Sequence, residues 1–256
     1  MTEPSRSGMH HYDAEFYRYI EEGSLRSARR VIATLRDLMA LPIESVLDVG
    51  CGAGAWLVAW KEQGSAVFGV DGAHVSPSSL IIDTHEFRAH DLRLSLDLGR
   101  RFALVQCLEV AEHLPEESAH LLVASLCRHS DIVLFSAAPP GQGGESHLNE
   151  RPYGYWRDHF AAQGYALFDP LRHRLRDDDG VMPWYRYNTL MFLREGSLPE
   201  LHRRLAGARV APGAAVPDIS PWTYRLRKLA VARLSVTAST WIATFKKRFF
   251  NLLGRS

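Results

Sequence analysis

The sequence predicts an α/β fold, in which a doubly wound, mostly parallel sheet of seven strands carries helices on both faces. Short β-branched and apolar runs alternate with helical stretches through the middle of the chain, a pattern typical of such a sheet. The first of these runs leads directly into the glycine-rich segment 50–54. Open α/β sheets bind nucleotide-like ligands with this strand–turn–helix arrangement, so the segment also predicts a ligand site.

The expected elements follow one another in order. Residues 11–40 are helix-rich, with an apolar face at helical spacing that ends before Pro42. Helices are also expected near 53–63 and 116–128. The expected strands are 45–50, 66–71, 86–91, 102–110, 131–137, 164–169 and 187–194. Because no full helix separates the last two strands, they could form an antiparallel pair at one edge of the sheet.

The chain divides into four predicted parts. A helical N-terminal cap covers residues 1–40, and the ligand-binding domain covers 41–200. A linker over 201–220, rich in Ala, Gly and Pro, leads to a basic C-terminal extension over 221–256. The net charge of +1 hides an asymmetry, because the last 56 residues carry a balance of +10 and the first 200 a balance of −9.

Several classes of protein are disfavoured by composition. Cys51, Cys107 and Cys127 have no C-x-x-C spacing, which argues against a disulfide framework and a zinc site and suits a reducing compartment. The start of the sequence has no apolar segment typical of a secretory signal, and the apolar stretch 234–245 is shorter than the roughly 20 residues of a membrane span. Adjacent carboxylates in the segment 176–180 cannot converge on one ion. We therefore expect a cytoplasmic protein without a metal site.

The segment SVLDVGCGAGAWLVAW, residues 45–60, contains the main ligand signal. Gly50, Gly52 and Gly54 stand at alternate positions, where glycine permits unusual dihedral angles and close approach of a ligand to the main chain. Gly50, Gly52 and Ala55 also satisfy a loose dinucleotide fingerprint. The glycines alone therefore fit either NAD or S-adenosylmethionine.

Two further residues favour S-adenosylmethionine. Asp48 lies inside the first strand, where a carboxylate is costly unless a cationic ligand or backbone amides meet it. Gly54 fills the third alternate position of a D-x-G-x-G-x-G pattern. Asp71 ends the second strand, where it could accept hydrogen bonds from both hydroxyls of a ribose, and it fits either cofactor.

These residues resemble motif I of the class I S-adenosylmethionine-dependent methyltransferases, and later segments resemble further motifs of that family in the same order. The matching segments are FGVDGAHV, RAHDL, LVQCLEVAEHLP, VLFSAAPPGQGGESHLNERPYGYWRDHFAAQGY and PWYRYNTLMFLR. The resemblance covers about residues 12–195 and is strongest to ubiquinone-type small-molecule methyltransferases, in a bacterial branch linked to glycans and natural products. One departure is Gly72, where a bulkier residue often follows the acidic one.

The resemblance implies a Rossmann-like methyltransferase fold, S-adenosylmethionine as cofactor and S-adenosylhomocysteine as product. The implied cofactor-binding residues are Asp48, Gly50, Gly52, Gly54, Asp71, Asp91 and Glu109. Asp91 would reach the adenine amino group, although it could instead cap the next segment. Glu109 would face the ligand crevice, although it could instead pair with the glycine loop.

His113 and His147 are the candidate catalytic bases. Methylation of an alcohol requires removal of its proton, and histidine titrates near neutral pH. Either histidine could instead have a purely structural role. Asn149 and Glu150 could orient His147 or bind substrate hydroxyls, and Trp156 is a further candidate substrate contact, although aromatic residues more often pack in a core.

The expected function is methyl transfer to a small acceptor, preferably a hydroxyl of a sugar, glycan or related metabolite, by resemblance to that branch. The alternatives are an N- or C-methyltransferase of a natural product, or a cofactor-binding pseudoenzyme that acts as a membrane-associated scaffold. The sequence leaves the oligomeric state open.

The C-terminal extension contains eight Lys/Arg residues and no acid. Its apolar residues fall within an arc of ~120° on a helix of ~100° per residue: Trp241, Ile242, Phe245, Phe249, Leu252 and Leu253. This pattern predicts peripheral contact with an anionic membrane, at its inner face, or packing on the chain's own domain or a second subunit. Nucleic-acid binding is disfavoured because the basic residues come without a recognised fold.

Overall fold

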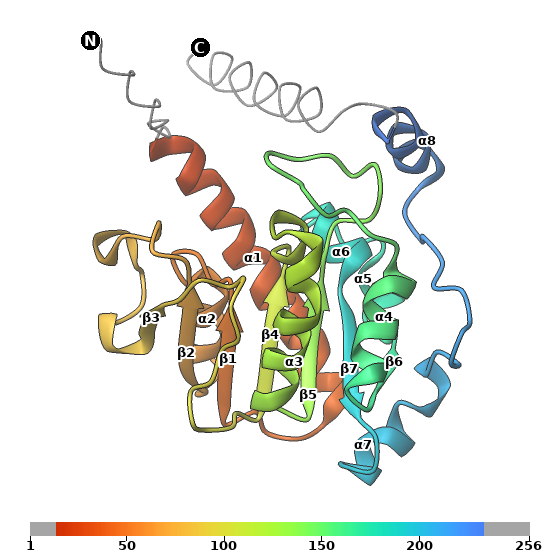
Figure 1. The fold of residues 1–256 in the computed structure, drawn as a ribbon, viewed down its shortest axis with the longest axis horizontal. Helices are drawn as coiled ribbons and strands as arrows, with labels where there is room; N and C mark the ends of the chain where they lie inside the picture. The colour runs from red at the N-terminus through yellow and green to blue at the C-terminus, as the bar shows by residue number, and fades with distance from the viewer. Residues whose placement is uncertain (1–13, 233–256) are drawn as a thin grey trace.

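The computed structural model describes residues 14–232 and contains a seven-stranded sheet between two layers of helices (Figure 1). Residues 1–13 of the predicted cap and 233–256 of the predicted extension lie outside the described residues. The strands are β1 Ser45–Val49, β2 Ala66–Asp71, β3 Phe87–Ala89, β4 Leu104–Leu108, β5 Ile132–Ser136, β6 Tyr165–Phe168 and β7 Leu190–Arg194. The predicted fold class is confirmed.

The strand order is β3-β2-β1-β4-β5-β7-β6, and β7 runs antiparallel to both of its neighbours while the other pairs are parallel. The predicted antiparallel pairing of the last two strands is thus confirmed, with β7 inserted between β5 and β6. The predicted start of the last strand at residue 187 was wrong, because Tyr187 and Asn188 belong to a short helix and β7 begins at Leu190.

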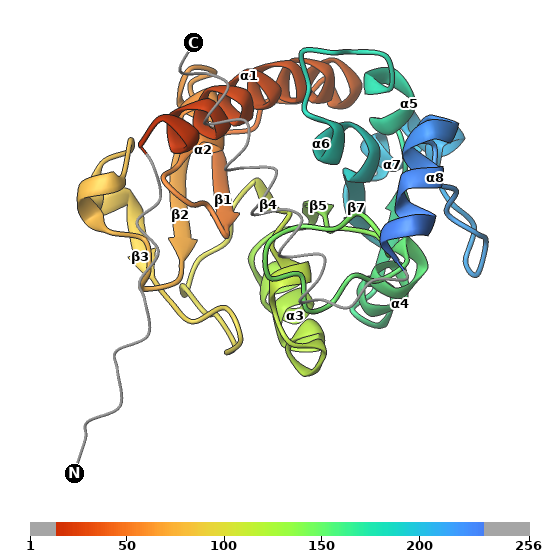
Figure 2. The same cartoon turned by 90° about the horizontal axis from the view of Figure 1, so that it is seen from above.

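Helices cover both faces of the sheet. They are α1 Ala14–Met39, α2 Ala55–Lys61, α3 Ala119–His129, α4 Tyr153–Ala162, α5 Arg172–Leu175, α6 Pro183–Asn188, α7 Pro199–Arg204 and α8 Trp222–Val231. Seen from above, α1 and α2 lie on one face and α3 and α4 on the other (Figure 2). The second half of α1 buries Ala28, Val31, Ile32 and Leu35 in the core between α1, α2 and the sheet, as its helical spacing predicts.

Two hydrophobic cores form because neighbouring residues of a strand point to opposite faces. Val46 and Leu134 belong to the core beneath α1 and α2, whereas Leu47 and Val133 belong to the core beneath α3 and α4. Both faces of the central strands are therefore filled by protein. The carboxyl ends of the parallel strands remain as the place where such a sheet receives a ligand.

The segment 205–218, predicted to belong to a linker, is attached to the edge strand β6. The Val210 amide donates to the Leu167 carbonyl at 3.0 Å, and the Asp169 amide donates to the Ala208 carbonyl at 2.8 Å. The buried guanidinium of Arg172 pairs with Asp169 and also donates to the Pro217 carbonyl at 3.1 Å. This segment leads the chain along the sheet to α8, and the proposed domain boundaries stay predictions.

Two further observations bear on the expectations from composition. Cys51, Cys107 and Cys127 are buried and form no disulfide. Among residues 14–232, none of the helices combines the length and the apolar character needed to cross a bilayer.

Candidate active site

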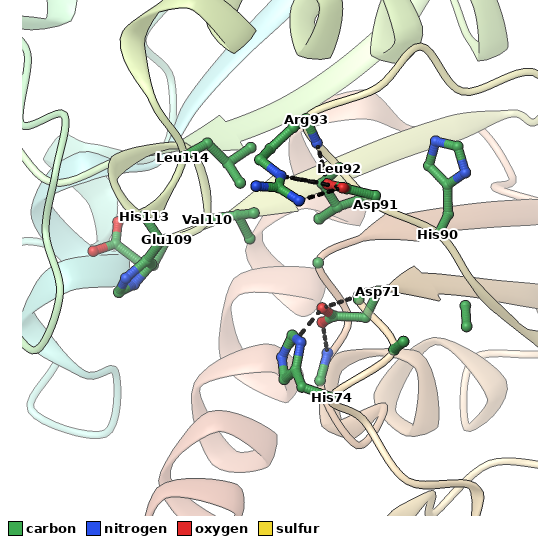
Figure 3. Close-up of a pocket in the computed structure, with 15 residues that line it drawn as sticks. Asp71, His74, His90, Asp91, Leu92, Arg93, Glu109, Val110, His113 and Leu114 are labelled. Atoms are coloured by element: carbon green, nitrogen blue, oxygen red, sulfur yellow. Dashed lines mark hydrogen bonds and ion pairs between the residues drawn. The ribbon is translucent and has the colours of Figure 1, made fainter. Parts of the chain in front are cut away.

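A cavity of about 840 Å³ opens at the carboxyl ends of β1, β2 and β4. Its lining comes from the glycine loop after β1, the end of β2, the loop after β3 and the segment after β4. Figure 3 shows Asp71 and the Asp91–Arg93 pair in one part of this lining and Glu109 and His113 in another. The cavity therefore has two chemically different ends.

Two of the three predicted loop glycines are explained by contacts within the protein. Gly50 has φ +88°, and a Cβ there would collide with Val110. Gly54 has φ +100° and precedes α2, where a Cβ would meet Ile82 at 3.0 Å. Both positions need glycine whether or not a ligand binds.

Gly52 differs from the other two loop glycines. It has φ +53°, yet no protein atom lies within 4 Å of the position that a Cβ would take. Gly52 also lines the cavity. The space beside Gly52 is open, so a ligand in the cavity could approach the main chain there.

Asp71 joins the glycine loop to the end of β2. Its Oδ2 accepts the Gly52 amide at 2.7 Å, and its Oδ1 accepts the Gly72 amide at 2.6 Å. A carboxylate offers about four acceptor positions, so both oxygens can still accept hydroxyl groups. These acceptor oxygens fit the hydroxyl groups of a ribose at this end of the cavity.

Asp48 lies within β1 and is not part of the cavity lining. Burial raises its pKa to about 7, the side chain of Gln106 opposes that shift, and the negative charge of Asp71 adds to it. Asp48 and Gly54 do not line the cavity, whereas the other five predicted cofactor-binding residues do.

Asp91 lines the cavity but is held by its neighbour Arg93. The Arg93 guanidinium donates to both carboxylate oxygens, at 2.9 Å and 2.6 Å, and the Arg93 amide donates to Oδ1 at 3.0 Å. These bonds lower the pKa of Asp91 to about 2. The capping interaction considered for Asp91 is present, and the adenine contact stays a prediction.

Glu109 follows β4 with the left-handed φ of +57°, which is uncommon for a residue with a side chain. Its carboxylate accepts the side-chain amides of Gln142 at 2.8 Å and Asn188 at 3.1 Å. Burial raises the pKa of Glu109, and the bonds from Asn188 and Gln142 oppose the shift. Its partners thus come from the loop after β5 and from α6, not from the glycine loop.

Glu112 was not singled out from the sequence, although it stands in the segment LVQCLEVAEHLP. It is fully buried, and burial together with the charge of Glu109 raises its pKa well above the ordinary value. Donor atoms of Glu112, His113 and His147 lie within 4.8 Å of one another. These three side chains could hold a metal ion, in contrast to the expected absence of a metal site.

His113 and His147 lie edge to face, with 4.8 Å between ring centroids. His113 is open to the cavity, but the protein around its ring displaces water and, together with the nearby His147, lowers its pKa to about 4. His113 is therefore a neutral imidazole at pH 7, with a nitrogen able to accept a proton. His147 does not line the cavity itself.

Glu150 orients His147 and the loop that carries it. Its Oε1 accepts from His147 Nδ1 at 2.8 Å and from the Gly143 amide at 2.7 Å, and its Oε2 accepts the Gly141 amide at 2.7 Å. Burial raises the pKa of Glu150, but these bonds outweigh it and leave the pKa below its ordinary value. The orienting role considered for Glu150 is the one that the contacts support.

The remaining predicted substrate contacts lie away from the cavity. Asn149 is buried, and its Oδ1 accepts from Arg151 Nε at 2.8 Å. Trp156 is 1% exposed and packs on Phe135 and Tyr155 in the core beneath α3 and α4. The prediction that Trp156 contacts substrate is therefore corrected, because an apolar ring on the inner face of α4 packs against the sheet.

The buried pair Glu109 and Glu112 generates a prediction about pH. The native state keeps a proton on Glu112 that the unfolded chain releases above a pKa of about 4.3. Stability should therefore fall as the pH rises above that value, by up to about 1.4 kcal/mol per pH unit for one retained proton. Denaturant unfolding at pH 5.5 and pH 8 should show a smaller loss for Glu112→Gln than for the unsubstituted chain. An equal loss in both would contradict the assignment.

The sequence is similar to those of known proteins. Residues 17–177 match the family model described as a methyltransferase domain. The ubiquinone biosynthesis O-methyltransferase of Pseudomonas syringae pv. tomato is 30% identical over 121 residues, which are 44% of this chain and 47% of that protein. The chain thus spans about half the length of the curated relatives that it matches.

Solved structures share the fold. A sugar N-methyltransferase from a Streptoalloteichus strain is 18% identical with a TM-score of 0.55, over 76% of this chain and 98% of that one. An amino pentose methyltransferase from Micromonospora echinaspora, solved with S-adenosylmethionine bound, is 17% identical with a TM-score of 0.51, over 74% of this chain and 100% of that one. At these identities the likeness shows the fold alone.

Proposed function

Because this chain belongs to the class I S-adenosylmethionine-dependent methyltransferases, we propose that it transfers a methyl group from that cofactor to a hydroxyl of a small, sugar-derived acceptor. The observation that carries the proposal is the two-ended cavity. One end offers Asp71 and the open space at Gly52, and the other offers the partly buried carboxylate of Glu109 and a neutral histidine.

The first end suits the cofactor's nucleoside. Asp71 would accept the ribose hydroxyls, and the main chain at Gly52 would lie against the ligand, since no side chain occupies that space. Asp91 also lines the cavity and would accept the adenine amino group, if its bonds to Arg93 leave an acceptor position free. S-adenosylmethionine supplies, when bound, an electrophilic methyl group on a sulfonium centre.

The second end suits the acceptor. His113 lines the cavity as a neutral imidazole, so it can take the hydroxyl proton as the new bond to carbon forms. His147 lies against it and is held by Glu150, which limits the movement of both rings. Most of the chain's contribution is the positioning of the two reactants in one cavity.

The choice of a sugar hydroxyl rests on the resemblance to the glycan branch. An amine acceptor is the second candidate, since two solved proteins of this fold are a sugar N-methyltransferase and an amino pentose methyltransferase. A panel of paired hydroxy- and amino-sugar nucleotides, assayed for S-adenosylhomocysteine release, distinguishes the two. Cofactor binding without turnover on any acceptor would favour the pseudoenzyme alternative.

The open space at Gly52 generates a prediction about cofactor binding. Gly52→Val should abolish binding of S-adenosylmethionine, expected in the micromolar range or about −8 kcal/mol, because the side chain would occupy the ligand's path. Gly64→Val is the matched control, since Gly64 also has a positive φ and open space but does not line the cavity. If calorimetry shows that both variants lose the same cofactor affinity, backbone strain and not a blocked ligand path causes the loss.

The two histidines generate a prediction about turnover. His113→Ala should lower kcat by roughly 10²-fold or more with cofactor affinity preserved, as expected for loss of a general base. The low pKa of His113 also predicts that kcat stays level from pH 8 down to about pH 5.5, because the ring remains neutral there.

An acid limb near pH 6.5 would contradict the assignment of His113. Full activity of both His113→Ala and His147→Ala would reject a histidine base altogether. Glu150→Gln separates orientation from chemistry, since it should lower kcat less than loss of the base itself.

A further inference from the structure

The apolar face of α8 points to solvent. Trp222, Leu226 and Leu229 are 66%, 54% and 63% exposed. At ~100° per residue their spacing places all three within an arc of ~60° on one side of the helix. A surface helix of a globular protein ordinarily turns such a stripe toward the core.

The opposite face of α8 holds the helix on the domain through polar and aromatic contacts. Lys228 is 4% exposed and its Nζ lies 2.5 Å from an Asp218 carboxylate oxygen. The ring of Tyr224 packs on Tyr187, with centroids 5.8 Å apart, and Arg227 donates to the Gln142 carbonyl at 3.4 Å. The exposed stripe is therefore a consequence of a defined orientation, and the described residues leave it largely open to solvent.

We propose that this face docks on an anionic membrane surface. Arg225 is exposed beside the stripe, and the next stretch of sequence, 233–256, contains five Lys/Arg residues and no acid. A tryptophan and two leucines flanked by basic residues match the chemistry of interfacial binding, in which apolar burial adds to attraction by acidic headgroups. The proposal does not depend on methyl transfer.

A second copy of the chain is a weaker occupant. A stable protein interface buries about 800 Å² on each partner. Three side chains on a ten-residue helix present much less surface than that, whereas a few anchors and a positive charge suffice for a lipid interface.

The docking face lies at the end of the molecule that carries the site. A Cβ at Gly141 would collide with the Lys228 carbonyl, and one at Gly143 would lie 2.9 Å from Val231, so α8 packs directly on this loop. The same loop is held by Glu150, the partner of His147. Figure 1 shows α8 beside the long loop that follows β5. Docking would therefore bring the carboxyl ends of the strands toward the membrane.

The test uses the full chain and sedimentation with vesicles. We expect binding to mixed phosphatidylcholine–phosphatidylglycerol vesicles, weaker binding as salt increases, and little binding to phosphatidylcholine alone. Replacement of Trp222, Leu226 and Leu229 by Ser should reduce partitioning by about tenfold or more, because the buried apolar surface is lost.

The matched control replaces Ile81 and Leu94 by Ser, since these side chains are 47% and 58% exposed on another part of the molecule. Because these side chains lie in the loops after β2 and β3, away from α8, its partitioning should fall much less than that of the triple variant. Arg225→Glu is the second docking variant. It keeps the apolar face and should also weaken binding, so it still tests the proposal if the triple variant misfolds.

Three results would overturn the proposal. The first is absence of binding to the anionic vesicles. The second is equal partitioning of the unsubstituted chain, the triple variant and Arg225→Glu, which would move the docking function away from α8. The third is dimerisation in sedimentation velocity that the triple variant abolishes, without vesicle binding, which would identify a second copy as the occupant.

Discussion

The carboxylate of Asp71 is the constraint on which the site depends. It accepts two backbone amides, from Gly52 on the loop after β1 and from Gly72 after β2. Both bonds are charge-assisted, which makes them stronger than bonds between neutral groups. They fix the glycine loop against the neighbouring strand and so keep open the space at Gly52. Asp71 thus holds the loop, together with the Gly50 and Cys51 amides that donate to the Val70 carbonyl, and it presents acceptor oxygens to the cavity.

The other end of the cavity is organised by buried carboxyl groups of different character. Glu109 is surrounded by the amides of Gln142 and Asn188, whereas Glu112 lies buried beside it and favours the protonated form. Burial raises the pKa of both groups, and the charge of Glu109 adds to the shift of Glu112. Carboxyl groups with shifted pKa values are common at functional sites. His113 is open to the cavity, and the surrounding protein and His147 both lower its pKa.

The sequence predicted local features well because each depends on a few neighbouring residues. The alternation of apolar runs and helical stretches was enough for the seven strands, and the glycine spacing was enough for the loop. The start of β7 was misplaced because Tyr187 and Asn188 suit a strand by residue type but complete a helix turn that begins at Pro183. The unusual backbone conformation predicted for the loop glycines is present at Gly50 and Gly54.

Contacts between distant segments could not be predicted from the sequence. Asn188 reaches Glu109 from 79 residues away, and Gln142 reaches it from 33 residues away. The burial of Trp156 depends on which side of α4 faces the sheet, and a ten-residue helix with aromatic and polar residues on several sides does not reveal it. Glu112 could have been found, because it stands one residue before His113 in a segment that had already been identified.

Titration calorimetry of the unsubstituted chain and of Asp71→Asn, with S-adenosylhomocysteine and with NAD, tests the central role of Asp71 most directly. We predict that the unsubstituted chain binds S-adenosylhomocysteine and not NAD. We also predict that Asp71→Asn, checked for folding by circular dichroism, loses about 1.5–3 kcal/mol of binding free energy, the range for hydrogen bonds to a charged group. Binding of NAD in place of S-adenosylhomocysteine, or an unchanged affinity in a folded Asp71→Asn variant, would contradict these predictions.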